Sequence, residues 1–308
     1  MPGCGPRTAG QQIAVTIFHV LNKKQTTTNQ KAPPQMSTSK DETNKQMALA
    51  SICAFGKAPA KQDDRTLKLK DILREANVLL GSNPLPAEYD FDDTHEIPLH
   101  PYQNPPKNNC VIAGRAHQTL RFEMAEQKRL INITDEDVVV EYKKQAGAEE
   151  KKDIETLASL KLWREHGWDA AGQNFKIKAF AKLDQGDHEQ IKLMIYINLG
   201  VGLGFFLPDS ARIQFRDGQP WGVTRDKAEH GHYVYVPGYT KDGPVCITWG
   251  RKQQMSWTFV DRYSDEAYVI IDDIDTPEKK RTLDEEKINE FLKKCAPVLG
   301  EADRVSPA

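Results

Sequence analysis

Apolar positions recur three or four residues apart through much of the first half of the chain, which is the spacing of amphipathic helices. This spacing predicts helices over residues 66–80, 110–127 and 153–166, and a further helix that begins at Thr134. Asn109 stands where an N-cap is expected, and Thr134 can form a capping box with Asp137. Between residues 85 and 109, five prolines exclude regular elements, so this stretch is predicted to be an extended loop.

In the second half, short apolar runs and alternating apolar and polar positions predict β-strands. The predicted strands cover residues 175–180, 201–207, 233–239, 245–249 and 267–271. Further helices are predicted at 188–199 and 255–263, and Thr282 caps a last one. An N-terminal helical half followed by a C-terminal antiparallel β half indicates an α+β fold.

Charge and composition set the first 65 residues apart from the rest. Residues 1–65 hold nine basic and four acidic residues, and their only aromatic side chains are Phe18 and Phe55. Such a segment cannot bury enough apolar area to offset the entropy of ordering it. We therefore expect a disordered basic tail over residues 1–65, a folded domain over 66–275 and a C-terminal helical extension over 276–308.

The sequence gives little sign of targeting to a membrane. The apolar run from Ile13 to Leu21 could be a signal or transit segment, but no small-x-small cleavage site follows it. A simple tail, or a shorter chain that starts at Met36, is the favoured interpretation. No run of 18 apolar residues occurs and the formal net charge is −2, so neither a membrane partner nor a nucleic-acid partner is predicted.

The cysteines are typical of a reduced compartment. There are five, they are widely spaced, and no CxxC motif occurs, so neither a disulfide framework nor a zinc ribbon is predicted. A cytoplasmic location is expected. The clearest chemical setting belongs to Cys110, which lies where a predicted helix begins. Backbone N–H groups and the helix dipole favour an anion there, which lowers the pKa of a thiol and predicts a nucleophile. The alternative is a buried structural cysteine.

His232 is the candidate partner for this thiol. It opens the strand 233–239, directly after Gly231, where an imidazole can face a site and form a thiolate–imidazolium pair. His230 is two residues away, a spacing compatible with metal binding, but no third ligand is apparent. The alternating glycines near residue 200 do not complete a GxGxxG motif. No metal or organic cofactor is predicted.

Several short segments form an ordered set between residues 85 and 272. They are Leu85-Pro86 with Tyr89-Asp90-Phe91, Gln103-Asn104, Asn108-Asn109-Cys110, Gln214 to Gly218, Gly231 to Tyr239, and Cys246 to Gly250. Together they resemble the papain-like cysteine peptidase superfamily, and in particular the C39-like peptidase proteins of bacteria and phages. The resemblance implies a papain-like fold whose helical half carries Cys110 and whose β half carries His232.

The resemblance also implies roles for individual residues. Cys110 resembles the nucleophile, and His232 resembles the residue that moves the proton. Papain-like enzymes orient this histidine with Asn or Asp, whereas the residue sixteen positions after His232 is Thr248. A Thr hydroxyl can accept the imidazole N–H, but it polarises the ring less than a carboxylate does.

The oxyanion donor departs from the family pattern as well. Gln103 resembles the oxyanion glutamine, but it lies one residue further from Cys110 than in papain, so Asn108 or Asn109 is an alternative donor. The implied function is a thiol hydrolase that cleaves peptide or amide bonds of a peptide or protein substrate. Two alternatives stay open: an inactive module of the same fold used for binding or assembly, and acyl transfer to an amine at the same site.

Overall fold

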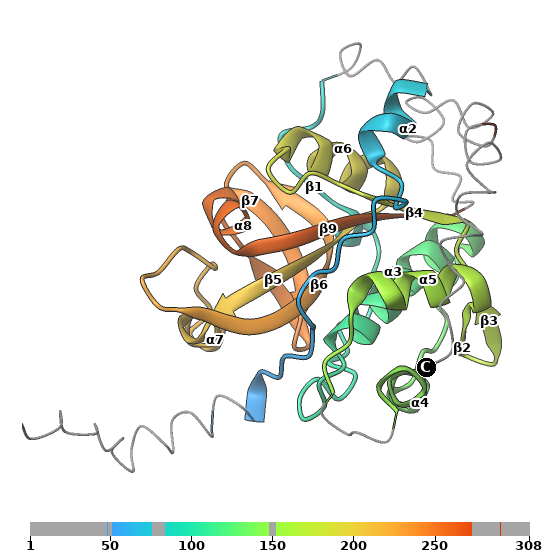
Figure 1. The fold of residues 1–308 in the computed structure, drawn as a ribbon, viewed down its shortest axis with the longest axis horizontal. Coiled ribbons are helices and arrows are strands. Elements are labelled where there is room, and N and C mark those ends of the chain that lie inside the picture. The colour runs from blue at the N-terminus through green and yellow to red at the C-terminus, as the bar shows by residue number, and fades with distance from the viewer. Residues whose placement is uncertain (1–47, 49–50, 76–83, 148–151, 273–289, 291–308) are drawn as a thin grey trace, which may run out of the picture. The chain divides into compact units, whose positions relative to one another are not determined.

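The structure, a computed structural model, describes residues 48, 51–75, 84–147, 152–272 and 290. All of them belong to one compact unit, residues 40–308. Helices dominate the first half of this part and an antiparallel sheet dominates the second (Figure 1). The helices are α2 (Leu69–Glu75), the short 3₁₀ helix η1 (Phe91–Thr94), α3 (Cys110–Gln127), α4 (Asp135–Ala146), α5 (Thr156–His166), α6 (His188–Asn198), α7 (Asp209–Arg216) and α8 (Trp257–Tyr263). The strands are β1 (Tyr89–Asp90), β2 (Trp168–Ala170), β3 (Gln173–Phe175), β4 (Ala179–Lys182), β5 (Val201–Pro208), β6 (Ala228–Thr240), β7 (Gly243–Thr248), β8 (Arg251–Gln254) and β9 (Ser264–Ile271).

Seven of these strands form the main sheet. Its order is β4-β9-β5-β6-β7-β8, all neighbours are antiparallel, and β1 pairs with β6 outside this row. The long strand β6 is central, and it turns into β7 through a tight hairpin in which Thr240 pairs with Gly243. β2 and β3 form a separate two-stranded sheet.

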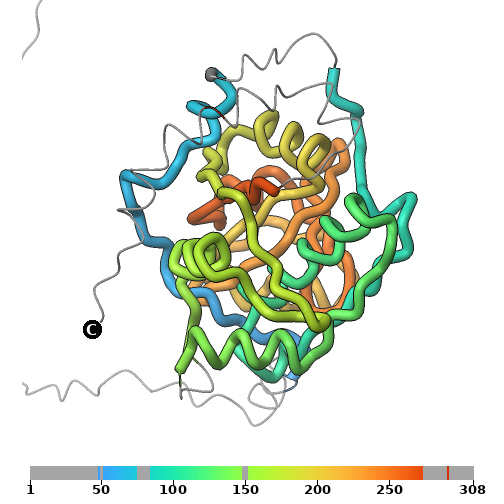
Figure 2. Tube along the Cα trace, turned by 90° about the vertical axis from the view of Figure 1, so that its right-hand side faces the viewer, coloured from blue at the N-terminus to red at the C-terminus, as the bar shows by residue number. Residues whose placement is uncertain are grey.

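Each face of the main sheet carries its own hydrophobic core. Along β6, Val234 packs in one core while Tyr233 packs in the other, because successive side chains of a strand point to opposite faces. β9 alternates in the same way, with Val269 on the first face and Tyr268 on the second. Helices α3, α4 and α5 lie on the face that bears Tyr233, and Figure 2 shows them in front of the strands. Helices α6 and α8 contribute to the core on the other face.

Helix α3 is enclosed by the rest of the fold. Fifteen of its 18 residues are buried, so it has no solvent-facing stripe of the kind found on surface helices. Gly114 allows its close approach to β6, because a Cβ atom there would lie 2.8 Å from the ring of Tyr233. The first turn of this helix is thereby held against the strand that carries His232.

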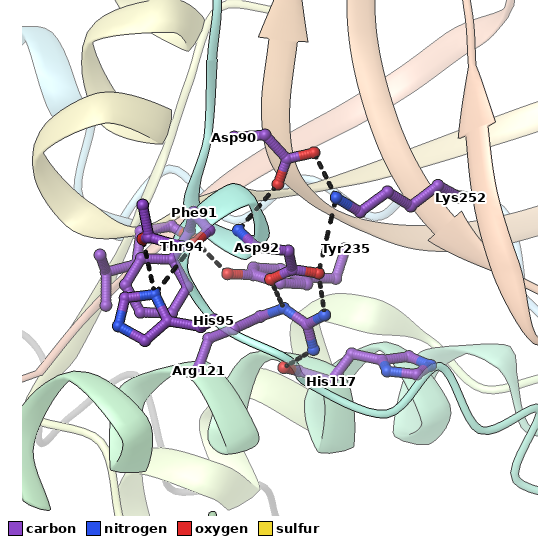
Figure 3. Close-up of polar contacts among 10 residues, drawn as sticks. Asp90, Phe91, Asp92, Thr94, His95, His117, Arg121, Tyr235 and Lys252 are labelled. Carbon is purple, nitrogen blue, oxygen red and sulfur yellow. Dashed lines mark hydrogen bonds and ion pairs between the residues drawn. The ribbon is translucent and has the colours of Figure 1, made fainter. Parts of the chain in front are cut away.

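A buried ion-pair cluster links α3 to the sheet (Figure 3). Arg121 of α3 is fully buried and donates from Nε to Asp92 Oδ1 at 3.0 Å and from Nη2 to Asp92 Oδ2 at 2.5 Å. Asp90 accepts the backbone N–H of Asp92 at 3.0 Å and the ammonium of Lys252 at 2.6 Å. Because Lys252 belongs to β8, the cluster joins the helical half to the edge of the sheet.

Many of the elements predicted from sequence are present, with shifts of a few residues at their ends. The helix at 110–127 and the Thr134–Asp137 capping box are confirmed. Asn109 does precede α3, but its side chain makes no capping hydrogen bond. The predicted strand at 175–180 is wrong as a single element, since Phe175 ends β3 and Ala179 begins β4 in a different sheet. The alternation of apolar and polar residues runs through both parts in the sequence, so only the strands that β3 and β4 pair with distinguish them.

The expected tail does not extend to residue 65. Cys53, Phe55 and Lys57 are 0%, 8% and 1% exposed, so this stretch is part of the fold. Its sequence shows no helical or strand periodicity because it is ordered by contacts with distant residues. The helix capped by Thr282, most of the C-terminal extension and nearly all of residues 1–50 lie outside the described residues.

Candidate active site

Cys110 is the first residue of α3 and is 2% exposed. Its sulfur lies beside backbone groups of Val111 and Tyr233, and Tyr233 directly follows His232 on β6. These backbone groups favour the thiolate, as expected for a cysteine at the start of a helix. Burial outweighs them and raises the pKa of the Cys110 thiol to about 12. The low thiol pKa predicted from sequence is therefore not found in the structure, because Cys110 is buried away from water.

His232 lies on β6 and is joined to Thr248 at the end of β7. Its Nε2 is 2.7 Å from the Thr248 hydroxyl oxygen, and both residues are buried. Within the described residues, Nδ1 of this imidazole has no hydrogen-bond partner. The ring nitrogen that a thiol would use is therefore the unoccupied one. The predicted contact between His232 and Thr248 is present, whereas no hydrogen bond joins His232 to Cys110 in this state.

Aromatic rings surround the imidazole. Trp249 stacks on it at a centroid distance of 4.6 Å, and Phe55 and Trp221 meet it edge-on at 5.7 and 6.4 Å. This enclosure lowers the pKa of His232 to about 3, mainly by burial, with a smaller contribution from the positive charge of Arg212. At neutral pH, therefore, both the thiol and the imidazole are uncharged in the described state.

Residues 53–58, which we call the covering segment, lie across this region between α3 and β6, and they are drawn in blue in Figure 1. Gly56 is so close to the loop before Cys110 that a Cβ atom there would lie 2.1 Å from the carbonyl oxygen of Asn108. The indole N–H of Trp249 donates to the carbonyl oxygen of Ala54 at 2.7 Å. The segment thus contacts the surroundings of both candidate catalytic residues and accounts for part of their burial.

The backbone of the covering segment pairs as a bound peptide would. The N–H groups of Gly56 and Lys57 both donate to the carbonyl oxygen of Gly231, at 3.0 Å, immediately before His232. On the other side, Ala58 N–H donates to Ile154 O at 2.9 Å, and Ile154 N–H donates to Gly56 O at 2.8 Å. These contacts form a parallel bridge between residues 57 and 154.

One buried amide side chain in this region, that of Asn104, was not singled out as an oxyanion donor in the sequence analysis. Asn104 is buried, and its amide nitrogen lies 3.5 Å from the carbonyl oxygen of Phe55 and 2.9 Å from that of Lys107. The side-chain amide of Asn109 instead donates to the carbonyl oxygen of Tyr102 at 2.7 Å. The signal for Asn104 was its position six residues before the cysteine, one closer than Gln103.

The neighbouring candidates behave differently. Gln103 has a left-handed backbone (φ 56°), and its carbonyl oxygen accepts the N–H of Lys107 at 2.8 Å.

His230, considered above as a metal ligand, lies 3.2 Å from a carboxylate oxygen of Asp209 and stacks on Phe55. In the part of the chain that the structure describes, no three His, Cys, Asp or Glu side chains meet as a metal site requires. Within the same residues, no helix combines the length and the apolarity needed to cross a membrane.

No protein-family model and no curated protein matches the sequence. Solved structures do match the fold. Xylellain, a cysteine protease from Xylella fastidiosa, aligns with a TM-score of 0.56 at 14% identity, over 72% of this chain and 97% of its own. The protein has a papain-like fold. Digestive procathepsin L 3 of Tenebrio molitor larval midgut gives a TM-score of 0.52 at 12% identity over 74% of this chain and 79% of its own. A proCathepsin B S9 from Trypanosoma congolense gives 0.50 at 13% identity, over 74% and 88%.

These alignments confirm the predicted α+β, papain-like arrangement, with helices in the N-terminal half and an antiparallel sheet in the C-terminal half. At such low identity they concern the fold. The narrower resemblance to C39-like peptidases, and the roles of the individual site residues, stay predictions.

Proposed function

We propose that this protein is a cysteine peptidase whose nucleophile is Cys110 and whose general base and acid is His232. The observation that carries the proposal is the 2.7 Å contact between His232 Nε2 and Thr248 on a papain-like fold, with no hydrogen-bond partner for Nδ1 among the residues that the structure describes. When Nε2 carries the proton and donates it to Thr248, Nδ1 has a free lone pair. A base in that tautomer, close to a cysteine at a helix start, is the arrangement that thiol hydrolysis needs.

The proposed reaction breaks one amide bond and consumes one water. Nδ1 of His232 takes the thiol proton, and the Cys110 thiolate attacks the carbonyl carbon of the scissile bond. The backbone N–H of Cys110 and the side-chain amide of Asn104 donate to the oxyanion that forms. The imidazolium gives its proton to the leaving amine, and a thioester to Cys110 is left. Water, deprotonated by His232, then releases the carboxylate product and restores the thiol.

The assignment of Asn104 rests on what the covering segment does in the site. The side-chain amide nitrogen of Asn104 lies 3.5 Å from the carbonyl oxygen of Phe55. The residue after Phe55, Gly56, packs against the loop that leads into Cys110. A substrate carbonyl replacing that of Phe55 would meet the same donor. Gln103 is the alternative oxyanion donor. It precedes Asn104 and has a left-handed backbone, so its side chain would have to reach the oxyanion from a different direction.

The test uses the full chain with Lys57→Glu, a change that weakens the covering segment as argued below. This protein is incubated with a degenerate peptide mixture, and the products are identified by mass spectrometry. We expect cleavage that is lost in the double variants with Cys110→Ala or His232→Ala and kept with Cys246→Ser, a buried cysteine outside the site. Equal cleavage with and without Cys110 would refute the proposal.

The second candidate is an inactive module of the same fold. It is favoured by the residue that contacts His232, because a threonine holds an imidazolium less strongly than Asn or Asp, and by the neutral state of both groups. The two candidates differ in one readout. An inactive module would bind peptides in the Lys57→Glu protein without cleaving any of them, whereas a peptidase would turn them over.

A further inference from the structure

Lys57 of the covering segment is buried as deeply as a core residue, at 1% exposure. Its ammonium donates to Asp265 Oδ2 at 2.8 Å and to the carbonyl oxygen of Ala58 at 2.9 Å, and it lies 3.3 Å from Glu266 Oε1. It also sits 5.0 Å from the centre of the Phe206 ring. Lysine is seldom fully buried unless its charge is paired, and here two carboxylates pair it.

The space around this lysine is shaped for a long side chain. A Cβ atom on Gly204 would lie 2.4 Å from Lys57 Cε and 2.5 Å from Glu266 Cγ. A Cβ atom on Gly231 would lie 1.8 Å from the Lys57 carbonyl oxygen. Gly204 thus leaves room for the side chain of the residue at position 57, and Gly231 leaves room for its backbone. We call Gly204, Phe206, Gly231, Asp265 and Glu266 the Lys57 site.

The Lys57 site adjoins the candidate catalytic residues through the backbone. Gly231, whose carbonyl oxygen binds the N–H of Lys57, is followed directly by His232. Ile154 pairs with the residues on either side of Lys57, so any extended peptide that replaced the segment could form the same bridge. The position of Lys57 is therefore the position of one residue of a peptide laid along the candidate site.

Glu266 is a buried acid that lies beside the ammonium of Lys57 when the segment is in place. It is 1% exposed, and burial raises the pKa of its carboxyl group, while the positive charge of Lys57 and the hydroxyl of Thr156 act in the opposite direction. Asp265 adds a second negative charge beside it. A neutral side chain in this place would leave buried carboxylate charge unpaired, which is costly, and an acidic one would add repulsion.

We propose that the Lys57 site selects peptide substrates with a lysine or arginine side chain at the residue that pairs with Gly231 and Ile154. The covering segment occupies the site with such a side chain of its own. The proposal rests on the proposed function as far as turnover is concerned. Binding of a basic side chain depends only on the Lys57 site.

The first experiment measures binding, so it does not require catalysis. Fluorescein-labelled peptides of sequence Ala-Phe-Gly-Xaa-Ala-Pro, which copy residues 54–59 with Xaa as Lys, Arg, norleucine or Glu, are titrated against the full chain carrying Lys57→Glu, with polarisation as readout. We expect the Lys and Arg peptides to bind at least about tenfold more tightly than the norleucine peptide, because only they pair the two carboxylates. The Glu peptide should bind most weakly.

The control removes both acids without changing their shape. Asp265→Asn with Glu266→Gln, added to Lys57→Glu, should abolish the preference for Lys and Arg, whereas Glu229→Gln, at an exposed carboxylate on the same strand as His232, should keep it. Equal affinity of the Lys and norleucine peptides, no binding of any peptide, or a preference that survives the removal of both acids would each overturn the proposal.

A second experiment separates this proposal from the catalytic one. The same four peptides, extended by several residues at both ends, are incubated with the Lys57→Glu protein and with its Cys110→Ala version, and cleavage is followed by mass spectrometry. Faster cleavage of the basic peptides supports both proposals. Selective binding without Cys110-dependent cleavage supports the Lys57 site and refutes the peptidase. Cleavage with no basic preference refutes the Lys57 site alone.

Discussion

Lys57→Met should expose Cys110 to alkylation, because Lys57 anchors the covering segment. The methionine side chain has similar length and no charge, so it keeps the packing against Phe206 and loses the ion pairs with Asp265 and Glu266. Removing one partner of a buried ion pair costs about 3–5 kcal/mol, because the other charge is left uncompensated. Protonation of Glu266 relieves part of this, which leaves roughly 2–3 kcal/mol against the docked segment.

The loss can be converted into a rate. When alkylation needs the segment to move away, each 1.36 kcal/mol lost from docking raises the open population and the rate about tenfold. We therefore expect iodoacetamide to modify Cys110 about 30- to 160-fold faster in Lys57→Met than in the unmodified chain at pH 7. The measurement is the fraction of the Cys110 peptide alkylated over time, by mass spectrometry. Cys246, which is 0% exposed in the sheet, serves as an internal reference that should not change.

The matched control is Lys61→Met, the same substitution four residues further along. Lys61 pairs with Glu155 at the surface, with 72% of its side chain exposed, so its loss should change the alkylation rate by less than about twofold. Equal rates for the unmodified chain and Lys57→Met would show that Lys57 does not hold the segment over Cys110. Equal acceleration by both substitutions would point to charge loss in general rather than to this anchor.

Four further predictions concern the site and the fold. In the Lys57→Met protein, Thr248→Val should slow alkylation of Cys110 about ten- to a hundredfold, whereas Thr248→Asn should not slow it. Equal alkylation rates for the three proteins would show that the Thr248 hydroxyl does not orient the imidazole. Asn104→Leu should lower kcat/KM for peptide cleavage about a hundredfold, and Gln103→Leu should lower it only slightly. If Gln103→Leu has the larger effect, Gln103 is the oxyanion donor. In the unmodified chain, alkylation of Cys110 should rise nearly tenfold per pH unit from pH 6 to 8, because the pKa of the thiol lies above this range both when it is buried, where it is about 12, and when it is open to water, where it is about 8.5; a flat profile would indicate a preformed thiolate. Arg121→Met should lower the free energy of unfolding by up to about 3–5 kcal/mol in urea, since it leaves the buried Asp92 with only the more distant ammonium of Lys252, at 3.9 Å, and a loss below about 1 kcal/mol would mean that this cluster does not hold the helical half to the sheet.

Local signals were sufficient for much of the fold and for part of the site. The cap at Thr134 and the helix that starts at Cys110 depend on interactions within one turn, so the sequence predicts them directly. The contact between His232 and Thr248 spans one hairpin, from β6 to β7, and it was anticipated from the resemblance to papain-like peptidases, which place the residue that orients the histidine on the following strand. Predictions of this kind succeed because the chain between the partners is itself regular.

The covering segment was missed because all its partners are distant. Lys57 meets Asp265 across 208 positions, and Ala54 meets Trp249 across 195. Nothing local distinguishes Lys57 from the other lysines of a polar, basic stretch, since burial of a lysine depends on carboxylates supplied by another element. Asn104 was passed over for a similar reason. The role proposed for it rests on the carbonyl oxygen of Phe55, which only the fold brings to it.

Closure of the site affects both access and chemistry. With the segment in place, burial raises the pKa of Cys110 to about 12, so only about 10⁻⁵ of the thiol is ionised at pH 7, and the residue is 2% exposed. Water reaching the sulfur would bring its pKa back toward about 8.5, where a few per cent is ionised at pH 7. The same water would raise the pKa of His232 from about 3, which makes it a usable base near neutral pH. We therefore expect even a rarely populated open state to account for nearly all reactivity of Cys110, and the stability of Lys57 in its site to set how often that state forms.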